Sequence, residues 1–379
     1  MQAVTLELAD AKHPLYERLS LLGLPGNKTE HYKHFAIKAL LAREYTLNMP
    51  QVFTPSKGEK LVIQNGVVTE FPKGVKVTLD DGFTPDMEHY DALYFLSHTL
   101  TPAVICIEVF EDAVFELEHE FTQKQTFLPY RISFKTAPNT RVEVFEKFQT
   151  QGTENSLLLY GVDAEVSADS TLCWIRDENT SHVETAVIGT HHYDVAKQGA
   201  LELKTFDFGS GLALHLYKID LSDYAWTDAS HLVLATEEAR RGNVVHINHN
   251  KPYAKSVQEA RTILKGKATG IFDGRIRVGH EARFSSAKQN SKAVLLSESA
   301  YMYAKPQLEI YIDELEASHG STIGQLDIDA LFYLRSRGIA LDEARKMLVL
   351  AFADTLIDTV GNEEAVKNIH ADFEAAYYK

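Results

Sequence analysis

The chain has 379 residues, of which 45% are hydrophobic and 24% charged, and this composition excludes a largely disordered protein. An excess of 53 acidic over 38 basic residues gives a formal charge of −15, which argues against nucleic-acid binding. No stretch approaches the about 18 consecutive apolar residues of a membrane span, and the N-terminus lacks the features of a secretory signal. The two cysteines, Cys106 and Cys173, lie in apolar runs, which excludes a disulfide scaffold and favours a reducing cytosol.

The first 50 residues predict a helical segment. Pro14 fits the first turn of a helix, and apolar residues follow at helical spacing up to Leu22. Thr29 is expected to be the N-cap of a second helix that carries Tyr32 and Phe35. Residues 51–100 are rich in turn formers and short strands, and predict a mixed connecting region.

Residues 101–320 predict a large block of β-strands. Short alternating runs recur between turn residues, and alternation places side chains on one face of a strand. Examples are Val142 and Val144, Leu201 and Leu203, Leu212 to Leu216, Ile276 and Val278, and Leu308 to Ile312. A block of this length suits a solenoid, which grows by adding coils, but no strict repeat is visible. A sandwich and a barrel therefore stay open on the pattern alone.

Residues 321–379 predict a helical hairpin. Asp327 fits the N-cap of a helix that ends near Gly338. A second helix is expected from about Leu341, with an apolar stripe of Ala344, Leu348, Phe352 and Leu356. Such a hairpin would close one end of the strand block.

Motifs for phosphate binding, dinucleotide binding, serine hydrolysis and zinc proteolysis are absent from the sequence. The pairs His191–His192 and His246–His249 lie in strand-like runs, where their spacing puts the two rings on opposite faces. Neither pair therefore predicts a shared metal. His319 differs because it lies where the strands give way to helices, beside Gly320, which permits close approach of another chain. A hydrogen-bonded turn histidine is the alternative for this residue.

The runs 305–339 and 270–300 resemble the SufB/SufD family of the SUF iron–sulfur cluster assembly system, and residues 24–35 resemble its N-terminal segment. Tyr32 stands where the family commonly has Trp. Ser318-His319-Gly320 and the low cysteine count favour the SufD branch, because SufB usually carries a Glu-His-Glu version of this segment and more cysteines.

The resemblance implies a right-handed parallel β-helix flanked by helical segments, acting as a non-catalytic cytoplasmic scaffold. It implies pairing with the paralogue SufB and docking of the ATPase SufC, in a SufB–SufC2–SufD assembly without nucleic acid or membrane. His319, with Ser318 and Gly320, would lie at the SufB interface and help build a nascent cluster with a SufB cysteine. No tightly bound cofactor is expected, only a transient cluster or iron. Ala317 stands where the family often has a cysteine, so a thiol there is absent or comes from the partner.

The C-terminal hairpin corresponds to the part of the family that docks SufC. The candidate contacts are Leu331, Phe332, Tyr333, Arg335 and Leu348; packing within the chain is the alternative for each. Two other functions stay open. One is a carbohydrate-active enzyme in a β-helix groove, which needs clustered carboxylates that the sequence does not reveal. The other is a structural homodimer acting alone.

Overall fold

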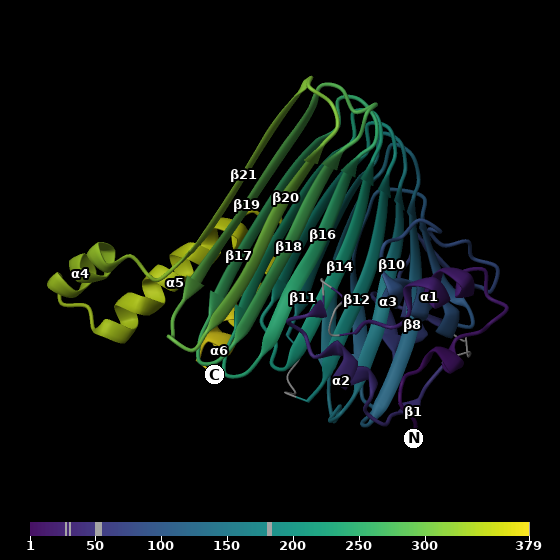
Figure 1. Ribbon diagram of the computed structural model, residues 1–379, viewed down its shortest axis with the longest axis horizontal. Helices are drawn as coiled ribbons and strands as arrows, with labels where there is room; N and C mark the ends of the chain where they lie inside the picture. Colours follow the sequence, from purple (N-terminus) through teal and green to yellow (C-terminus); the bar gives the residue numbers. More distant parts are fainter. Residues whose placement is uncertain (27–28, 30–31, 50–54, 180–183, 379) are drawn as a thin grey trace.

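The computed structural model describes residues 1–26, 29, 32–49, 55–179 and 184–378. Its centre is a parallel β-helix in which successive strands alternate between two sheets (Figure 1). Even-numbered strands from β6 to β20 form most of a 10-stranded sheet, and odd-numbered strands from β7 to β21 form most of an 11-stranded sheet. The β-helix expected from the resemblance is therefore confirmed, and the sandwich and barrel are excluded.

The 10-stranded sheet contains β1 Thr46–Leu47, β5 Val75–Asp80, β6 Val104–Val109, β8 Thr126–Thr136, β10 Leu157–Val166, β12 Ala186–Val195, β14 Leu212–Leu221, β16 Arg240–His249, β18 Thr269–Val278 and β20 Tyr301–Ile310. The 11-stranded sheet contains β2 Ser56–Lys57, β3 Leu61–Gln64, β4 Val67–Phe71, β7 Ala113–Phe121, β9 Arg141–Thr150, β11 Thr171–Glu178, β13 Ala200–Asp207, β15 Trp226–Ala235, β17 Lys255–Leu264, β19 Ser285–Leu295 and β21 Leu315–Gly324. Strands therefore begin before residue 101 and continue beyond residue 320.

In-register pairing stacks like positions of successive coils. Val142, Leu172 and Leu201 are register partners on β9, β11 and β13, and each is fully buried. Side chains alternate between the two faces of a strand, so one row from each sheet fills the interior between the sheets, here called the lumen. The inward-facing side chains of the two sheets together form the main apolar core. The lumen thus buries the alternating pairs that the sequence singles out on β9, β13 and β18, whereas Leu214 and Leu216 of β14 are buried under the N-terminal segment. On the last coil, Leu308 and Ile312 are only half-buried and Ile310 is exposed.

The turns that lead from the even-numbered to the odd-numbered strands also stack. Asn139, Asp169 and Gln198 each adopt a positive φ, and each backbone N–H donates to the equivalent turn of the next coil. Farther along the column the same left-handed position holds Tyr224 and Tyr253, whose rings stack at 4.6 Å. Asparagine and aspartate tolerate this backbone conformation well. In tyrosine it is sterically unfavourable, and the stacking of the two rings offsets this unfavourable energy.

The N-terminal segment packs on the outer face of the 10-stranded sheet. It contains a short 3-10 helix Leu6–Leu8, α1 Tyr16–Leu22, α2 Ile37–Leu41 and α3 Ala92–Leu100. The helix expected after Pro14 is confirmed as α1. The second helix is shorter than predicted, because α2 begins after Ala36 and Thr29 is not its N-cap. Residues 30–31 of the predicted helix lie outside the described residues.

The C-terminal segment contains α4 Ile328–Ser336, α5 Leu341–Ile357 and α6 Glu363–Tyr377. Asp327 caps α4 as predicted, since its carboxylate accepts from two backbone N–H groups. The buried face of α5 is rotated from the predicted stripe: Ala344 and Leu356 are buried, but Leu348 and Phe352 are half-exposed. Tertiary packing against the sheet and α6 selects this face. None of the described helices has the length and apolarity needed to cross a membrane.

Candidate functional site

The last coil leaves both sheets with an edge that no other strand of the described residues covers. β20 is the terminal strand of one sheet and β21 of the other, and both strands are exposed or half-exposed along their whole length. Their exposed large apolar side chains are Tyr301, Tyr303, Ile310 and Ile323. Free strand edges that carry apolar side chains are suited to pairing with another chain. We call this surface the open end.

His319 lies in the middle of β21, at the open end. Its register partner is Gln289 of β19, whose side chain is buried in the lumen, so His319 faces the same interior row. Within the described chain no strand covers β21, and His319 is consequently exposed. The sequence predicts a position at the junction of strands and helices, but β21 continues to Gly324 and α4 begins only at Ile328.

The neighbours of His319 divide between the two faces of β21. Ser318 and Gly320 flank it and are exposed on the opposite face of β21, whereas Ala317, two residues before His319, points to the same face as His319. A Cβ added to Gly320 would meet Oδ1 of Asn290 at 3.4 Å, an ordinary contact, so packing within this chain does not require glycine there. The open end therefore offers an imidazole in the lumen row, with a small apolar side chain where a thiol would stand beside it.

Neither cysteine serves the open end. Cys106 lies on β6 and Cys173 on β11, several coils away in the strand order. Burial raises the pKa of Cys106 to about 11 and that of Cys173 to about 12. Because the thiolate is the metal ligand and the nucleophile, both thiols are inert at neutral pH. A thiolate for chemistry at His319 has to come from elsewhere.

The lumen also contains buried ionisable side chains that the sequence does not single out. Glu146 accepts from Nε1 of Trp174 at 2.6 Å and lies 3.0 Å from Nε2 of His119. Burial alone would raise the pKa of Glu146, but the hydrogen bonds and the charge of Arg176 lower it. This carboxylate is therefore held ionised in the interior.

A second buried network surrounds Arg241 on β16. The guanidinium pairs with Glu178 at 2.7 Å and with Asp207, and all three side chains are almost fully buried. Burial raises the pKa of Asp207 to about 6 despite Arg241. His215 lies 2.8 Å from Glu178 and 2.8 Å from Arg176, and burial together with Arg176 lowers its pKa well below the usual value. The alternation of side chains along each strand places all of these residues on the inner face. A charged residue at an inward-facing position is therefore the signal by which the sequence could have revealed this network.

A cluster with metal-ligand chemistry lies on the outer face of the 10-stranded sheet. Ligand atoms of Asp86, His192 and Asp220 lie within 4.8 Å of one another. The ammonium of Lys218 already lies between the carboxylates, 2.6 Å from Asp86 and 2.9 Å from Asp220. Burial would raise the pKa of Asp220, but His192 and Lys218 lower it. The cation position is thus filled by a side chain, and these carboxylates are neutralised within the protein.

This cluster bears on two expectations from the sequence. His191 is buried and His192 faces outward, so their predicted separation on two faces is confirmed. The clustered carboxylates that a groove enzyme requires do exist on one face, contrary to the sequence interpretation. Their ion pairs with Lys218 leave them poorly suited to acid–base catalysis, which needs a carboxyl free to gain or lose a proton.

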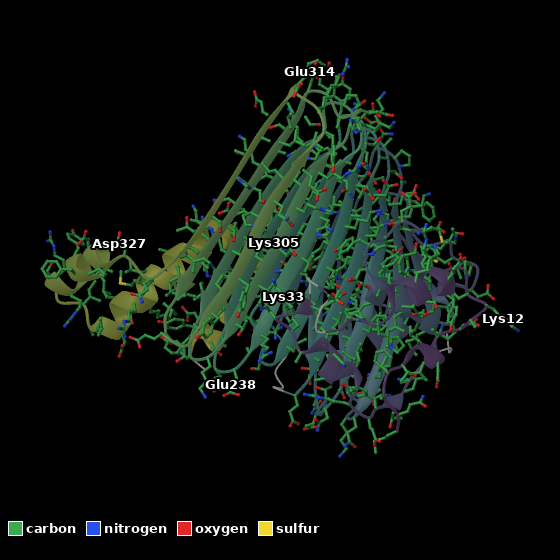
Figure 2. All side chains as sticks on the ribbon, viewed as in Figure 1. Lys12, Lys33, Glu238, Lys305, Glu314 and Asp327 are labelled. Carbon is green, nitrogen blue, oxygen red and sulfur yellow. The ribbon has the colours of Figure 1, made fainter. Side chains whose placement is uncertain are left out.

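The C-terminal hairpin presents an apolar surface away from the strands. Figure 1 shows α4 extending beyond β21, and Asp327 marks its start in Figure 2. Phe332 is 73% exposed and Tyr333 is 57% exposed, with the Arg337 guanidinium 5.2 Å from the centroid of the Tyr333 ring, and Arg335 is also exposed. Leu331 is half-buried and lines a cavity of about 690 Å³ between the hairpin and the sheet. The candidate contacts therefore separate into freely exposed and partly packed side chains.

A parallel β-helix flanked by N-terminal and C-terminal helices defines the class of β-solenoid proteins. A family model described as SUF system FeS cluster assembly, SufBD core domain, matches residues 119–352, well over half of the chain. The chain belongs to this family.

Curated relatives agree with this assignment. The chain is 38% identical over 117 residues to the iron–sulfur cluster assembly protein SufD of Escherichia coli, covering 31% of this chain and 28% of that protein. It is 32% identical over 188 residues to a SufBD family protein of Synechocystis, covering 49% and 40% respectively. SufD of Bacillus subtilis is 28% identical over 147 residues, covering 39% and 34%. The matched stretches thus span less than half the length of these relatives.

Proposed function

We propose that this chain is a non-catalytic SufD-type scaffold subunit that lends His319 to a cluster built jointly with a SufB-type paralogue. The observation that carries the proposal is the exposure of His319 in the lumen row of an uncovered β-helix end. A neutral imidazole is a ligand for iron, and one ligand from each of two chains makes a site that neither chain completes alone. The nascent cluster is the cargo of this site and is held transiently.

The paralogue would pair with β20 and β21. Both edges are ten residues long and carry exposed apolar side chains, among them Tyr303 and Ile323. Strand pairing would satisfy the free backbone groups and bury this apolar surface. The partner's cysteine would supply the thiolate, since Ala317 stands beside His319 and both cysteines of this chain lie on distant coils.

The hairpin would dock a SufC-type ATPase. The exposed Phe332 and Tyr333 provide aromatic anchors of the kind that dominate interface energies, and Arg335 lies beside them on α4. Leu331 and Leu348 support the hairpin from its half-buried side. Nucleotide-driven closure of two such ATPases would pull on the hairpins and shift one β-helix against the other, which would open the shared site.

Co-expression of the chain with its SufB and SufC partners tests these contacts. Phe332→Asp is expected to lose SufC while keeping SufB, and Ile323→Asp to lose SufB while keeping SufC. Leu21→Asp on α1 is the matched control for the first variant, since Leu21 is 75% exposed. Val114→Asp on β7, where Val114 is 62% exposed, is the control for the second. Both controls should retain both partners.

His319→Ala tests the chemistry. The variant is expected to assemble with both partners and to lose de novo cluster formation, read from the visible absorption of the purified complex. Unchanged cluster formation would overturn the role of His319. A chain that binds neither partner and forms only a dimer with itself would leave the stand-alone homodimer.

A further inference from the structure

Behind His319, the lumen contains two glutamine side chains in the same row. Register places Gln258, Gln289 and His319 at equivalent positions on β17, β19 and β21. Neighbouring strands lie about 4.8 Å apart, so side chains in such a row stack on one another. Gln258 is 1% exposed and Gln289 is 3% exposed. At the open end, His319 therefore lies next to the buried side-chain amide of Gln289.

The hydrogen bonding of this glutamine pair is incomplete. Nε2 of Gln289 donates to Oε1 of Gln258 at 2.5 Å. Oε1 of Gln289 is buried and has no hydrogen-bond partner among the residues that the structure describes. An unpaired buried acceptor costs about 1–3 kcal/mol, so a donor from the next position of the row would stabilise it. That next position is His319.

The amide of Gln289 is also fixed in place from the opposite sheet. A Cβ added to Gly274 would lie 2.7 Å from Nε2 of Gln289 and 2.6 Å from the tip of the Phe272 ring. Glycine at this position therefore makes room for the amide, which then packs directly against the backbone of β18. A side chain held by packing and by a hydrogen bond to Gln258 is preorganised to position its neighbour.

We propose that Gln289 is a positioning residue for His319. Its unpaired Oε1 would accept a hydrogen bond from one ring N–H of His319 when the exposed ring turns toward it, and this bond would direct the unprotonated ring nitrogen out of the open end. The inference rests on the proposed function, because the outward nitrogen is the one that would bind iron. Histidine ligands commonly donate their second ring N–H to a carbonyl or carboxylate, and loss of such a partner typically lowers metal affinity about 10–100-fold.

The tautomer of His319 in the chain of 379 residues tests the inference without metal or partner. Two-bond ¹H–¹⁵N correlations of ¹⁵N-histidine-labelled protein report the tautomer, and His319→Ala identifies the signals. Wild type is expected to show one tautomer. Gln289→Met keeps the volume but removes the strong acceptor, so it should show a mixture. Gln289→Glu keeps an acceptor and should restore the single tautomer.

Asn290→Ala is the matched control, because Asn290 is the next residue of β19 and points to the other face. It should leave the His319 tautomer unchanged. A second readout is the shift of the His319 signals on addition of Zn²⁺, whose apparent affinity should fall about 10–100-fold in Gln289→Met and not in Asn290→Ala.

A tautomer mixture in wild type, or a single tautomer in Gln289→Met, would overturn the inference. The wild-type spectrum decides even if Gln289→Met fails to fold. The two proposals can be refuted independently. Cluster formation that survives in His319→Ala would refute the proposed function, whereas the tautomer experiment tests only the role of Gln289.

Discussion

Replacement of Arg241 by Met tests the energetics of the charged lumen. The change removes the cation that pairs with Glu178 and Asp207, and it leaves two carboxyl groups buried without it. Breaking a buried ion pair by removing one partner costs about 3–5 kcal/mol. With an unfolding entropy of about 2.1 cal/mol/K per residue, this loss lowers the melting temperature by about 4–6 °C if the chain unfolds as one unit.

The cost should depend on pH. Burial already raises the pKa of Asp207 to about 6 in the folded protein, above its usual value of about 3.9. Without Arg241, the folded-state pKa values of Asp207 and Glu178 rise further. A carboxyl group with a raised folded-state pKa contributes stability at low pH that is lost as pH rises through that pKa. The variant should therefore be closest to wild type near pH 5 and furthest below it near pH 8.

Urea unfolding followed by circular dichroism at pH 5 and pH 8 measures the effect. Arg240→Met is the matched control, because Arg240 precedes Arg241 on β16 and is exposed. The control should stay within about 0.5 kcal/mol of wild type at both pH values. A loss below about 1 kcal/mol at pH 8, or an equal loss at both pH values, would refute the reasoning.

Three further predictions concern other parts of the chain. Gly189→Ala should destabilise the fold by about 1–3 kcal/mol in urea unfolding, because its Cβ would lie 2.2 Å from Nδ1 of His215; a neutral effect would contradict the packing. Asp91→Ala removes the N-cap of α3 and the partner of Tyr32, and should cost about 1–2 kcal/mol and speed proteolysis of the N-terminal segment. Both cysteines should resist iodoacetamide at pH 8 by mass spectrometry, since their raised pKa values keep them as thiols; rapid labelling of the folded chain would contradict this.

The sequence predicts the individual strands better than it predicts their repetition in successive coils of the β-helix. Alternating apolar residues identify β9, β13 and β18, because the lumen needs one face of each strand. The repeat escapes notice because the equivalent strand starts Ala186, Leu212, Arg240, Thr269 and Tyr301 follow at intervals of 26, 28, 29 and 32 residues. Turns absorb these differences while the strands stay in register, so a fixed period never appears in the sequence.

The helices divide in the same way. Asp327 predicts α4 correctly because a capping carboxylate acts locally, through the backbone N–H groups of the next turn. The apparent cap at Thr29 does not start a helix; turns occupy residues 33–36, and α2 follows. The stripe on α5 is misassigned because packing against the sheet and α6 selects the buried face. Local signals are thus predictable where tertiary contacts do not override them.

The candidate site is the least predictable part, because its meaning comes from the strand order. Its position beside Gly320 sets His319 apart in the sequence, but an ordinary turn histidine remains the alternative until the resemblance assigns it a role. Its row in the lumen and its place beside Gln289 follow from register across coils 30 residues apart, which no local pattern encodes. The same holds for Glu178 and Arg241, which are 63 residues apart in sequence and meet only through coiling.

The two ends of the β-helix are built differently, and this asymmetry favours a partner at one of them. At the beginning, the six-residue β5 pairs antiparallel with β6, and the other sheet ends in the two-residue β2. Short or antiparallel caps of this kind blunt an edge against association. At the other end, β20 and β21 are each ten residues long, and no strand in the described part of the chain caps them. Two long strand edges of this kind would favour aggregation in a protein that acts alone, and this supports the proposed pairing of the open end with a second chain.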